Sequence, residues 1–235
     1  MTQHHEDHEH DGSLPEGVYD YDYYVGRHRN RQLVYRLRRR TDEVARAIRK
    51  YGDGRLATIV DVGTADGLML ENLRKRFSNV RFVGLDRSLS LLSANPAASF
   101  SKVFGDAEVL PFATACADVV IATAVVEHLP HPNSLAKESS RVLRPGGLLV
   151  MTTPEPFMER LASKVGLLKD SGHQHTFDLN QLCAMIASNG MTILDRHKFM
   201  FSPIGFPAEK VFERVFGPLG LRLIMANQFL VARRG

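Results

Sequence analysis

The stretch IVDVGTADGLML, residues 59–70, decides the fold of this protein. An apolar, β-branched run ends in an acid and is followed by a short loop with glycines at positions 63 and 67. A strand, a tight glycine turn and a helix in this order are typical of the first unit of a doubly wound α/β sheet. The loop spacing is G-x-x-x-G, and Ala65 stands where a further glycine is expected.

Strand and helix patterns alternate from residue 57 onward. Near-continuous apolar strands indicate a mostly parallel sheet with helices on both faces, a Rossmann-like fold. Arg144-Pro145-Gly146-Gly147 predicts a helix stop followed by a turn. The strands are expected at 57–62, 80–86, 101–107, within 117–129, 148–155, 191–201 and 221–234, and the helices between them at 67–77, 88–96, 133–143 and 178–189.

The length of 235 residues fits one α/β domain with a substantial core. We expect a disordered tail rich in His and acids at 1–15, a basic helical cap at 16–54, and the main domain at 55–235, with cap inserts at 154–178 and 202–220. No apolar run approaches the roughly 20 residues of a membrane span. The first residues lack the apolar core of a secretory signal. With only two cysteines, Cys116 and Cys183, the chain is expected to be cytoplasmic.

Positive charge is concentrated near the start of the chain. The net charge is +4, and ten of the thirty Lys and Arg residues fall within residues 27–50, where Leu33, Leu37, Val44 and Ile48 recur at near-helical spacing. This pattern predicts a basic amphipathic helix. One interpretation is a surface for anionic lipid or nucleic acid. A solvated helix face that packs on the domain through its other side is favoured, because charge runs usually face water.

Two further acids follow the next strands along the chain. Asp86 ends the second strand, about 20 residues after the glycine loop, where an acid accepts both hydroxyls of a ribose. Asp106 follows the third strand, where a carboxylate can accept a hydrogen bond from the amine of adenine. Because ligands bind beyond the carboxyl ends of such strands, these positions indicate an adenosine.

The loop GTADG disfavours a dinucleotide. A pyrophosphate site has the pattern G-x-G-x-x-G, whereas here Asp66 is expected to project a negative charge into the phosphate position. That charge suits a cationic ligand. S-adenosylmethionine (SAM) carries an ammonium and a sulfonium and no phosphate, so the loop favours SAM over NAD.

These motifs together resemble the class I SAM-dependent methyltransferases, in particular the small-molecule group of ubiquinone and menaquinone type. The resemblance covers roughly residues 55–200 and rests on five segments in order: VDVGTADG, FVGLD, GDAEVLPF, VVEHLPHP with RVLRPGGLLV, and HTFDLNQLCAMIASNG. It implies a seven-stranded sheet whose last strand is antiparallel, with SAM as methyl donor and S-adenosylhomocysteine as product.

The resemblance also implies roles for single residues. Asp61 and Gly63 would line the methionine end of SAM, and Ala65 and Gly67 would bind the cofactor from the same loop. Of the remaining cofactor-binding positions, Asp86 and Arg87 belong to the ribose side, Asp106 and Ala107 to the adenine side, and Thr123 to the sulfonium. For Asp61 the alternative to a cofactor role is capping of the following turn. For Asp106 the alternative is the role of an ordinary turn aspartate. A positive φ at Ala65 would cost about 1–2 kcal/mol, whereas a negative φ would be tolerated.

Histidines near the fourth strand are candidates for acid–base chemistry. A base is needed only when the acceptor atom must lose a proton. His128 is a candidate general base, with a loop-holding structural role as the equal alternative. His175, together with His173, is a further candidate in the cap insert. No acid–His–Cys cluster accompanies them, so no metal site is predicted, and the four histidines at positions 4, 5, 8 and 10 are expected to form a flexible tail.

The acceptor is expected to be a small molecule. The Phe-rich segment 199–221 either lines a pocket for an apolar acceptor, such as a lipid, a quinone or a natural product, or packs on the edge of the sheet, which is slightly favoured. With the basic helix, this segment leaves peripheral membrane contact open. Two alternatives also remain. One is an RNA or protein methyltransferase that uses the Arg-rich helix, although VVEH stands where an N-P-P-Y-like tetrapeptide would lie. The other is a catalytically silent SAM-binding or partner-binding domain. The oligomeric state is not indicated.

Overall fold

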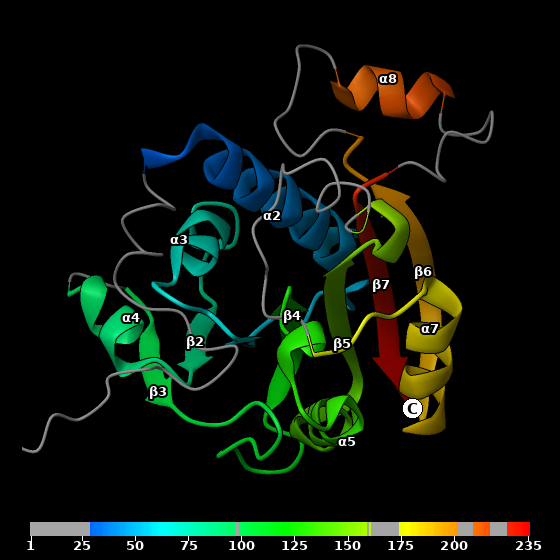
Figure 1. The fold of residues 1–235 in the computed structure, drawn as a ribbon. Coiled ribbons are helices and arrows are strands. Elements are labelled where there is room, and N and C mark those ends of the chain that lie inside the picture. The colour runs from blue at the N-terminus through cyan, green and yellow to red at the C-terminus, as the bar shows by residue number, and fades with distance from the viewer. Residues whose placement is uncertain (1–28, 97–98, 159, 161–173, 202–208, 217–224) are drawn as a thin grey trace, which may run out of the picture.

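The computed structural model describes residues 29–96, 99–158, 160, 174–201, 209–216 and 225–235. Its centre is one seven-stranded sheet with the strand order β3-β2-β1-β4-β5-β7-β6 (Figure 1). Strands β1 to β5 run parallel, and β7 is antiparallel to both of its neighbours. This confirms the predicted fold class. The strands are β1 (Thr58–Val62), β2 (Arg81–Asp86), β3 (Ser101–Phe104), β4 (Ala117–Thr123), β5 (Leu143–Pro154), β6 (Met191–Phe199) and β7 (Asn227–Arg234).

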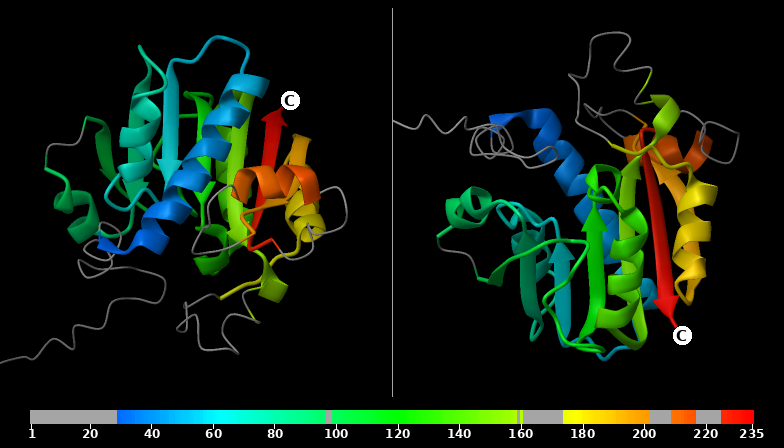
Figure 2. Two further views of the ribbon diagram at one scale, coloured as in Figure 1. Left: turned by 90° about the horizontal axis from the view of Figure 1, so that it is seen from above. Right: turned by 60° about the horizontal axis from the view of Figure 1, so that its bottom comes forward.

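Helices cover both faces of the sheet (Figures 1 and 2). The helices α2 and α3 pack on one face, and α5 and α7 pack on the other. The elements are α2 (Arg31–Tyr51), α3 (Leu68–Arg74), α4 (Leu89–Ala94), a 3₁₀ turn η1 (Val126–His128), α5 (Pro132–Val142), α7 (Leu179–Ser188) and α8 (Glu209–Phe216).

Alternation along the strands divides the core into two layers. Within β1, Val60 joins the cluster beneath α5 and α7, whereas Ile59 joins the cluster beneath α2 and α3. Successive side chains of a strand point to opposite faces, so a strand covered on both sides must be apolar throughout. This is why the strands read as continuous apolar runs.

The segment Arg144–Gly147, which the sequence predicts as a turn, lies within β5. Helix α5 ends at Val142, and β5 begins at Leu143 rather than near residue 148. Arg144 donates to Asp118 and, over 2.9 Å, to Asp53, and the hydrogen bond to Asp118 raises the pKa of Arg144. These bonds attach Arg144 to the amino edge of the sheet, and residues 144–147 form an irregularity in β5 between the paired positions Leu143 and Leu148.

Helix α2 starts at a side-chain cap and packs through its second half. Asn30 Oδ1 accepts the N–H of Gln32 at 2.9 Å, which satisfies one donor at the helix start. Val44 and Ile48, one turn apart, lie buried in the core. The basic helix predicted at 27–50 is thus found over the described part of that range.

Several predicted regions lie outside the described residues: 1–15, 16–28, 161–173, 202–208 and 217–224. The expected tail and most of the two cap inserts fall there. Within the described helices, none is long and apolar enough to cross a membrane.

Candidate functional site

The predicted site residues meet where the parallel strands end. β1 pairs with β2 on one side and with β4 on the other, and Val62 lies opposite Leu85 and Ala122. Asp61, Asp86 and Thr123 therefore stand at the carboxyl ends of three adjacent strands. In a doubly wound sheet this edge is the usual place for a ligand.

The glycine loop is fixed to β2 by backbone bonds. Gly63 and Thr64 both donate to the carbonyl of Leu85, at 2.8 and 3.0 Å, and Gly67 donates to the carbonyl of Thr64 at 2.9 Å. Both glycines have positive φ, 73° and 78°. A Cβ on Gly63 would lie 2.3 Å from a methyl of Val125, so this position needs glycine for conformation and for space.

Ala65 lies in the left-handed region, with φ of 53°. Of the two cases that the sequence left open, the structure has the strained one. The backbone N–H of Ala65 donates to Asp86 Oδ2 at 2.7 Å. A charge-assisted bond of this kind offsets part of the strain and holds the loop in place without a third glycine.

Asp86 therefore has a loop-holding contact that the sequence did not indicate. Its Oδ1 also accepts the N–H of Ser88, at 2.8 Å. A carboxylate has about four lone-pair sites, so two backbone donors leave capacity for further donors such as ribose hydroxyls. The structure is compatible with the ribose role and adds the contact with the loop.

Two further carboxylates lie buried around the loop. Asp61 Oδ2 accepts the hydroxyl of Thr64 at 2.9 Å, which matches the turn-capping alternative for this residue. Asp66, expected to project into the ligand space, is only 1% exposed. With Asp86, three acidic side chains surround one loop, and a cationic ligand fits this donor set better than a pyrophosphate.

The adenine-side residues form a turn. Asp106 Oδ1 accepts the N–H of Glu108 at 2.8 Å, which is the turn contact named as its alternative. Arg87 Nε lies 3.9 Å from Asp106 Oδ2 and links the end of β2 to the end of β3. Ala107 is buried beside them. A role toward adenine stays a prediction for these residues.

Past β4 the chain turns sharply next to the loop. Thr123 Oγ1 lies 4.0 Å from Met69 Sδ, on α3. Ala124 has φ of 56°, and its N–H donates to the carbonyl of Thr152 at 2.8 Å. These contacts place Thr123 against the first turn of the helix that follows the glycine loop.

The two candidate histidines lie on segments that pack together. The carbonyl of Glu127 accepts the N–H of Gln174 and that of His175, at 3.0 and 3.1 Å. His175 Nε2 is 3.3 Å from the carbonyl oxygen of Pro130, and His128 donates its backbone N–H to Val125 at 2.9 Å. His128 thus holds its loop through its backbone, and a catalytic role for its ring stays a prediction. His173 lies outside the described residues.

Glu127 is a residue that sequence reasoning missed. Its side chain is buried, and Oε2 accepts the hydroxyl of Thr153 at 3.2 Å. An acid within the apolar run VVEHL was the available signal. Among the described residues, no group of three His, Cys, Asp or Glu side chains is arranged to hold a metal ion.

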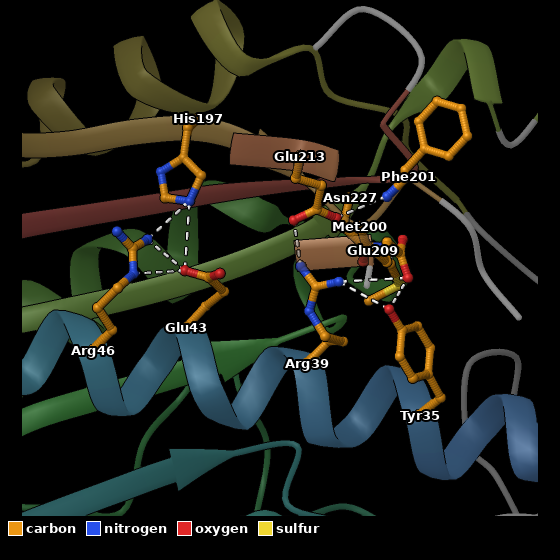
Figure 3. Close-up of polar contacts among 10 residues, drawn as sticks. All are labelled: Tyr35, Arg39, Glu43, Arg46, His197, Met200, Phe201, Glu209, Glu213 and Asn227. Carbon is orange, nitrogen blue, oxygen red and sulfur yellow. Dashed lines mark hydrogen bonds and ion pairs between the residues drawn. The ribbon is translucent and has the colours of Figure 1, made fainter. Parts of the chain in front are cut away.

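A second polar cluster joins α2 to α8 above this edge (Figure 3). Arg39, only 2% exposed, donates to Glu213 Oε2 at 2.6 Å and lies 3.6 Å from Glu209 Oε2. Tyr35 donates to Glu209 and accepts from Arg39 at 2.9 Å. We call Tyr35, Arg39, Glu209 and Glu213 the cap cluster. The sequence predicted a solvated arginine face, and for Arg39 that prediction is wrong, because α8 covers it.

Comparison with known proteins identifies the family. Residues 27–195, well over half of the chain, match the model of a family described as "Methyltransferase domain". The chain belongs to the class I methyltransferases. A malonyl-[acyl-carrier protein] O-methyltransferase of Coxiella burnetii is 30% identical over 132 residues, which are 54% of this chain and 44% of that protein.

Two further proteins are similar over larger parts of this methyltransferase. A ubiquinone biosynthesis O-methyltransferase of Colwellia psychrerythraea is 25% identical over 62% of this chain and 65% of its own length. The chain therefore spans less than two thirds of both curated relatives. The crystal structure of an S-adenosylmethionine dependent methyltransferase from Mesorhizobium loti superposes with a TM-score of 0.62 at 17% identity, covering 83% of this chain and 100% of that one.

Proposed function

We propose that this methyltransferase transfers a methyl group from SAM to an oxygen atom of a small-molecule acceptor. The observation that carries the proposal is the pair of acids, Asp61 and Asp86, at the ends of the adjacent strands β1 and β2, around a glycine loop fixed to β2. The relatives named as O-methyltransferases support an oxygen acceptor, and the name that includes ubiquinone supports an apolar one.

Each residue would contribute by holding and orienting the ligand. Asp86 would accept the ribose hydroxyls while it keeps its bond to Ala65, so that the loop and the ribose are positioned together. Asp61 and Thr123 would border the methionine end. SAM supplies a methyl group on a cationic sulfur, and the protein contributes alignment of the acceptor and exclusion of water.

A hydroxyl acceptor must also lose a proton. His128, on η1 directly after β4, is the proposed base. We expect His128→Ala to lower turnover and to flatten the dependence of turnover on pH. The measurement is turnover against pH with both proteins at saturating substrate. An unchanged profile would assign His128 to the structural role.

The first test is calorimetric titration with SAM, S-adenosylhomocysteine and NAD. Micromolar binding of the two sulfur compounds and no binding of NAD is the expected result. It would justify screening phenolic, quinone and carboxylate acceptors for methylation. No binding of either sulfur compound would contradict the proposal. Binding without turnover across the panel would instead favour the catalytically silent alternative.

A further inference from the structure

Helix α8 has two unlike faces. Glu209 and Glu213, one turn apart, point toward Arg39 of α2 (Figure 3). Val211 and Val215 follow each glutamate by two residues, which places them about 200° around the helix, on the opposite side. Their exposed fractions are 60% and 54%. The helix therefore turns carboxylates inward and an apolar pair outward.

In these four described side chains α8 differs from an ordinary surface helix, which exposes its charges and buries its apolar residues. Arg39 explains why the carboxylates face inward, because a buried guanidinium needs negative partners. It does not explain two neighbouring valines in water. An outward apolar pair on a helix whose orientation is fixed indicates a surface that something else covers.

The amino half of α2 carries a second unusual feature. Residues 29–41 contain six arginines and no acid. A cation in the first turn of a helix opposes the helix dipole, so Arg31 does not serve the stability of α2 in this way. Within the described part of the chain, Arg29, Arg31 and Arg38 form no ion pair, and all three are exposed. Val34, 44% exposed, lies on the same stripe as Arg31 and Arg38.

Both features lie at one end of the molecule. The amino end of α2 and the whole of α8 are found beyond the carboxyl ends of the parallel strands in the right view of Figure 2. The candidate functional site occupies the same edge of the sheet. Phe157, just after β5, adds another exposed apolar side chain at this end.

We propose that this end of the methyltransferase docks on the surface of an anionic lipid bilayer. A bilayer offers diffuse negative charge to arginines that lack protein partners, and an apolar layer just beneath it for aliphatic side chains. Aliphatic groups spread over separate helices and flanked by arginines suit such a broad surface. Docking would also bring the entrance of the site to an apolar acceptor, and this last point alone rests on the proposed function.

The test measures binding of the full chain to vesicles by co-sedimentation. Vesicles of neutral phosphatidylcholine are compared with vesicles that contain phosphatidylglycerol, at low and at high salt. We expect binding to the anionic vesicles only, weakened strongly by salt.

Two double variants, each with a matched control, show which residues bind the vesicles. Arg31→Gln/Arg38→Gln should weaken binding by about 20-fold, roughly fivefold per arginine. Its matched control is Arg49→Gln/Lys50→Gln, two exposed cations at the other end of α2, which should change binding by about twofold at most. Val211→Ser/Val215→Ser should weaken binding several-fold. Leu89→Ser/Val109→Ser, similarly exposed but after β2 and β3, at the other side of the sheet from α8, should weaken binding less. Unchanged circular dichroism verifies folding of each variant.

Three outcomes would overturn the proposal. The wild type could fail to bind anionic vesicles at low salt. The control variants could lose as much binding as the test variants. Concentration-dependent dimerisation that Val211→Ser/Val215→Ser abolishes, with no vesicle binding, would assign the face to a second copy of the chain. None of these results depends on SAM binding, so they are distinct from failure of the proposed function.

Discussion

The glycine-loop region and the cap cluster stand at the same edge of the sheet, but they are built in different ways. The loop region depends on residues close in sequence: Asp86 lies 21 positions from Ala65, which it binds. The cap cluster depends on a contact between Arg39 and Glu213, which are 174 positions apart. The spacing of the glycines and of Asp86 is a motif that can be recognised in the sequence, although the bond between Asp86 and Ala65 is not. The distant ion pairs of the cap cluster leave no motif at all. The predictions below test this contrast, from the largest expected effect to the smallest.

Removing the cation of the cap cluster should have the largest effect. Arg39→Met leaves Glu209 and Glu213 without their buried partner, at a cost of about 3–5 kcal/mol. We expect α8 to detach while the sheet stays folded, which amide hydrogen exchange would show as lost protection over residues 209–216. The exposed neighbour gives the control, because Arg38→Met should leave protection intact. Equal protection in both variants would show that α8 is held by other contacts.

In the loop region, substitution of Asp86 should lower the affinity for SAM. Asp86→Ala removes an acceptor of the Ala65 N–H and the expected ribose contact, so SAM binding should weaken by about 1–3 kcal/mol. Calorimetry measures the affinity, and thermal unfolding of the ligand-free protein separates loop damage from lost contact. Unchanged affinity would remove Asp86 from the ribose. Asp86→Asn keeps one acceptor oxygen and should give a smaller loss.

Acid pH should loosen the attachment of α2 to β6. Burial alone raises the pKa of Glu43, but its hydrogen bond with His197 and the charge of Arg46 outweigh this and leave the pKa lowered. At Asp195, burial likewise raises the pKa, and the charge and hydrogen bond of His197 reverse the direction. A carboxyl whose pKa falls on folding stabilises the protein above its ordinary pKa and loses that contribution as pH falls.

Urea unfolding at pH 6 and at pH 3.5 measures this effect. At pH 6 the free energy of unfolding of the wild type should exceed that of Glu43→Gln/Asp195→Asn by about 1 kcal/mol, and this difference should shrink at pH 3.5. The pH window follows from ordinary carboxyl values of 4.5 and 3.8. A difference that stays constant with pH would mean that neither carboxyl contributes through its charge.

The smallest effect is expected at Ala65. Its φ of 53° costs about 1–2 kcal/mol, and glycine relieves this but loses about 0.5–1 kcal/mol through greater freedom of the unfolded chain. Ala65→Gly should therefore raise the free energy of unfolding by up to about 1 kcal/mol and leave SAM binding equal or tighter. Chemical denaturation and calorimetry measure the two. A clear loss of either would show that the buried methyl of Ala65 packs usefully.

Much of the fold could be predicted from the sequence. The seven strands, the antiparallel last strand and the glycine loop follow from apolar runs, turn residues and the resemblance to methyltransferases. The helix stop before Arg144 was predicted correctly, but the predicted turn lies inside β5, as an irregularity between the paired positions Leu143 and Leu148. Arg144 bonds there to Asp118 and Asp53, which are distant in sequence. Turn propensity describes only neighbouring residues, and here the distant contacts decide.

The sequence by itself determined the order of strands and helices along the chain, the glycine loop and the acids that follow the strands. Each of these features depends on residues a short distance apart in the sequence. Only the tertiary structure decided that Ala65 is strained and bound to Asp86, that Arg39 is buried, and that α8 turns its valines outward. The physical reason is that backbone conformation in a loop and the partner of a charge depend on which distant segments fold against them. An arginine-rich stretch looks the same in sequence whether its side chains face water, a buried carboxylate or a lipid surface.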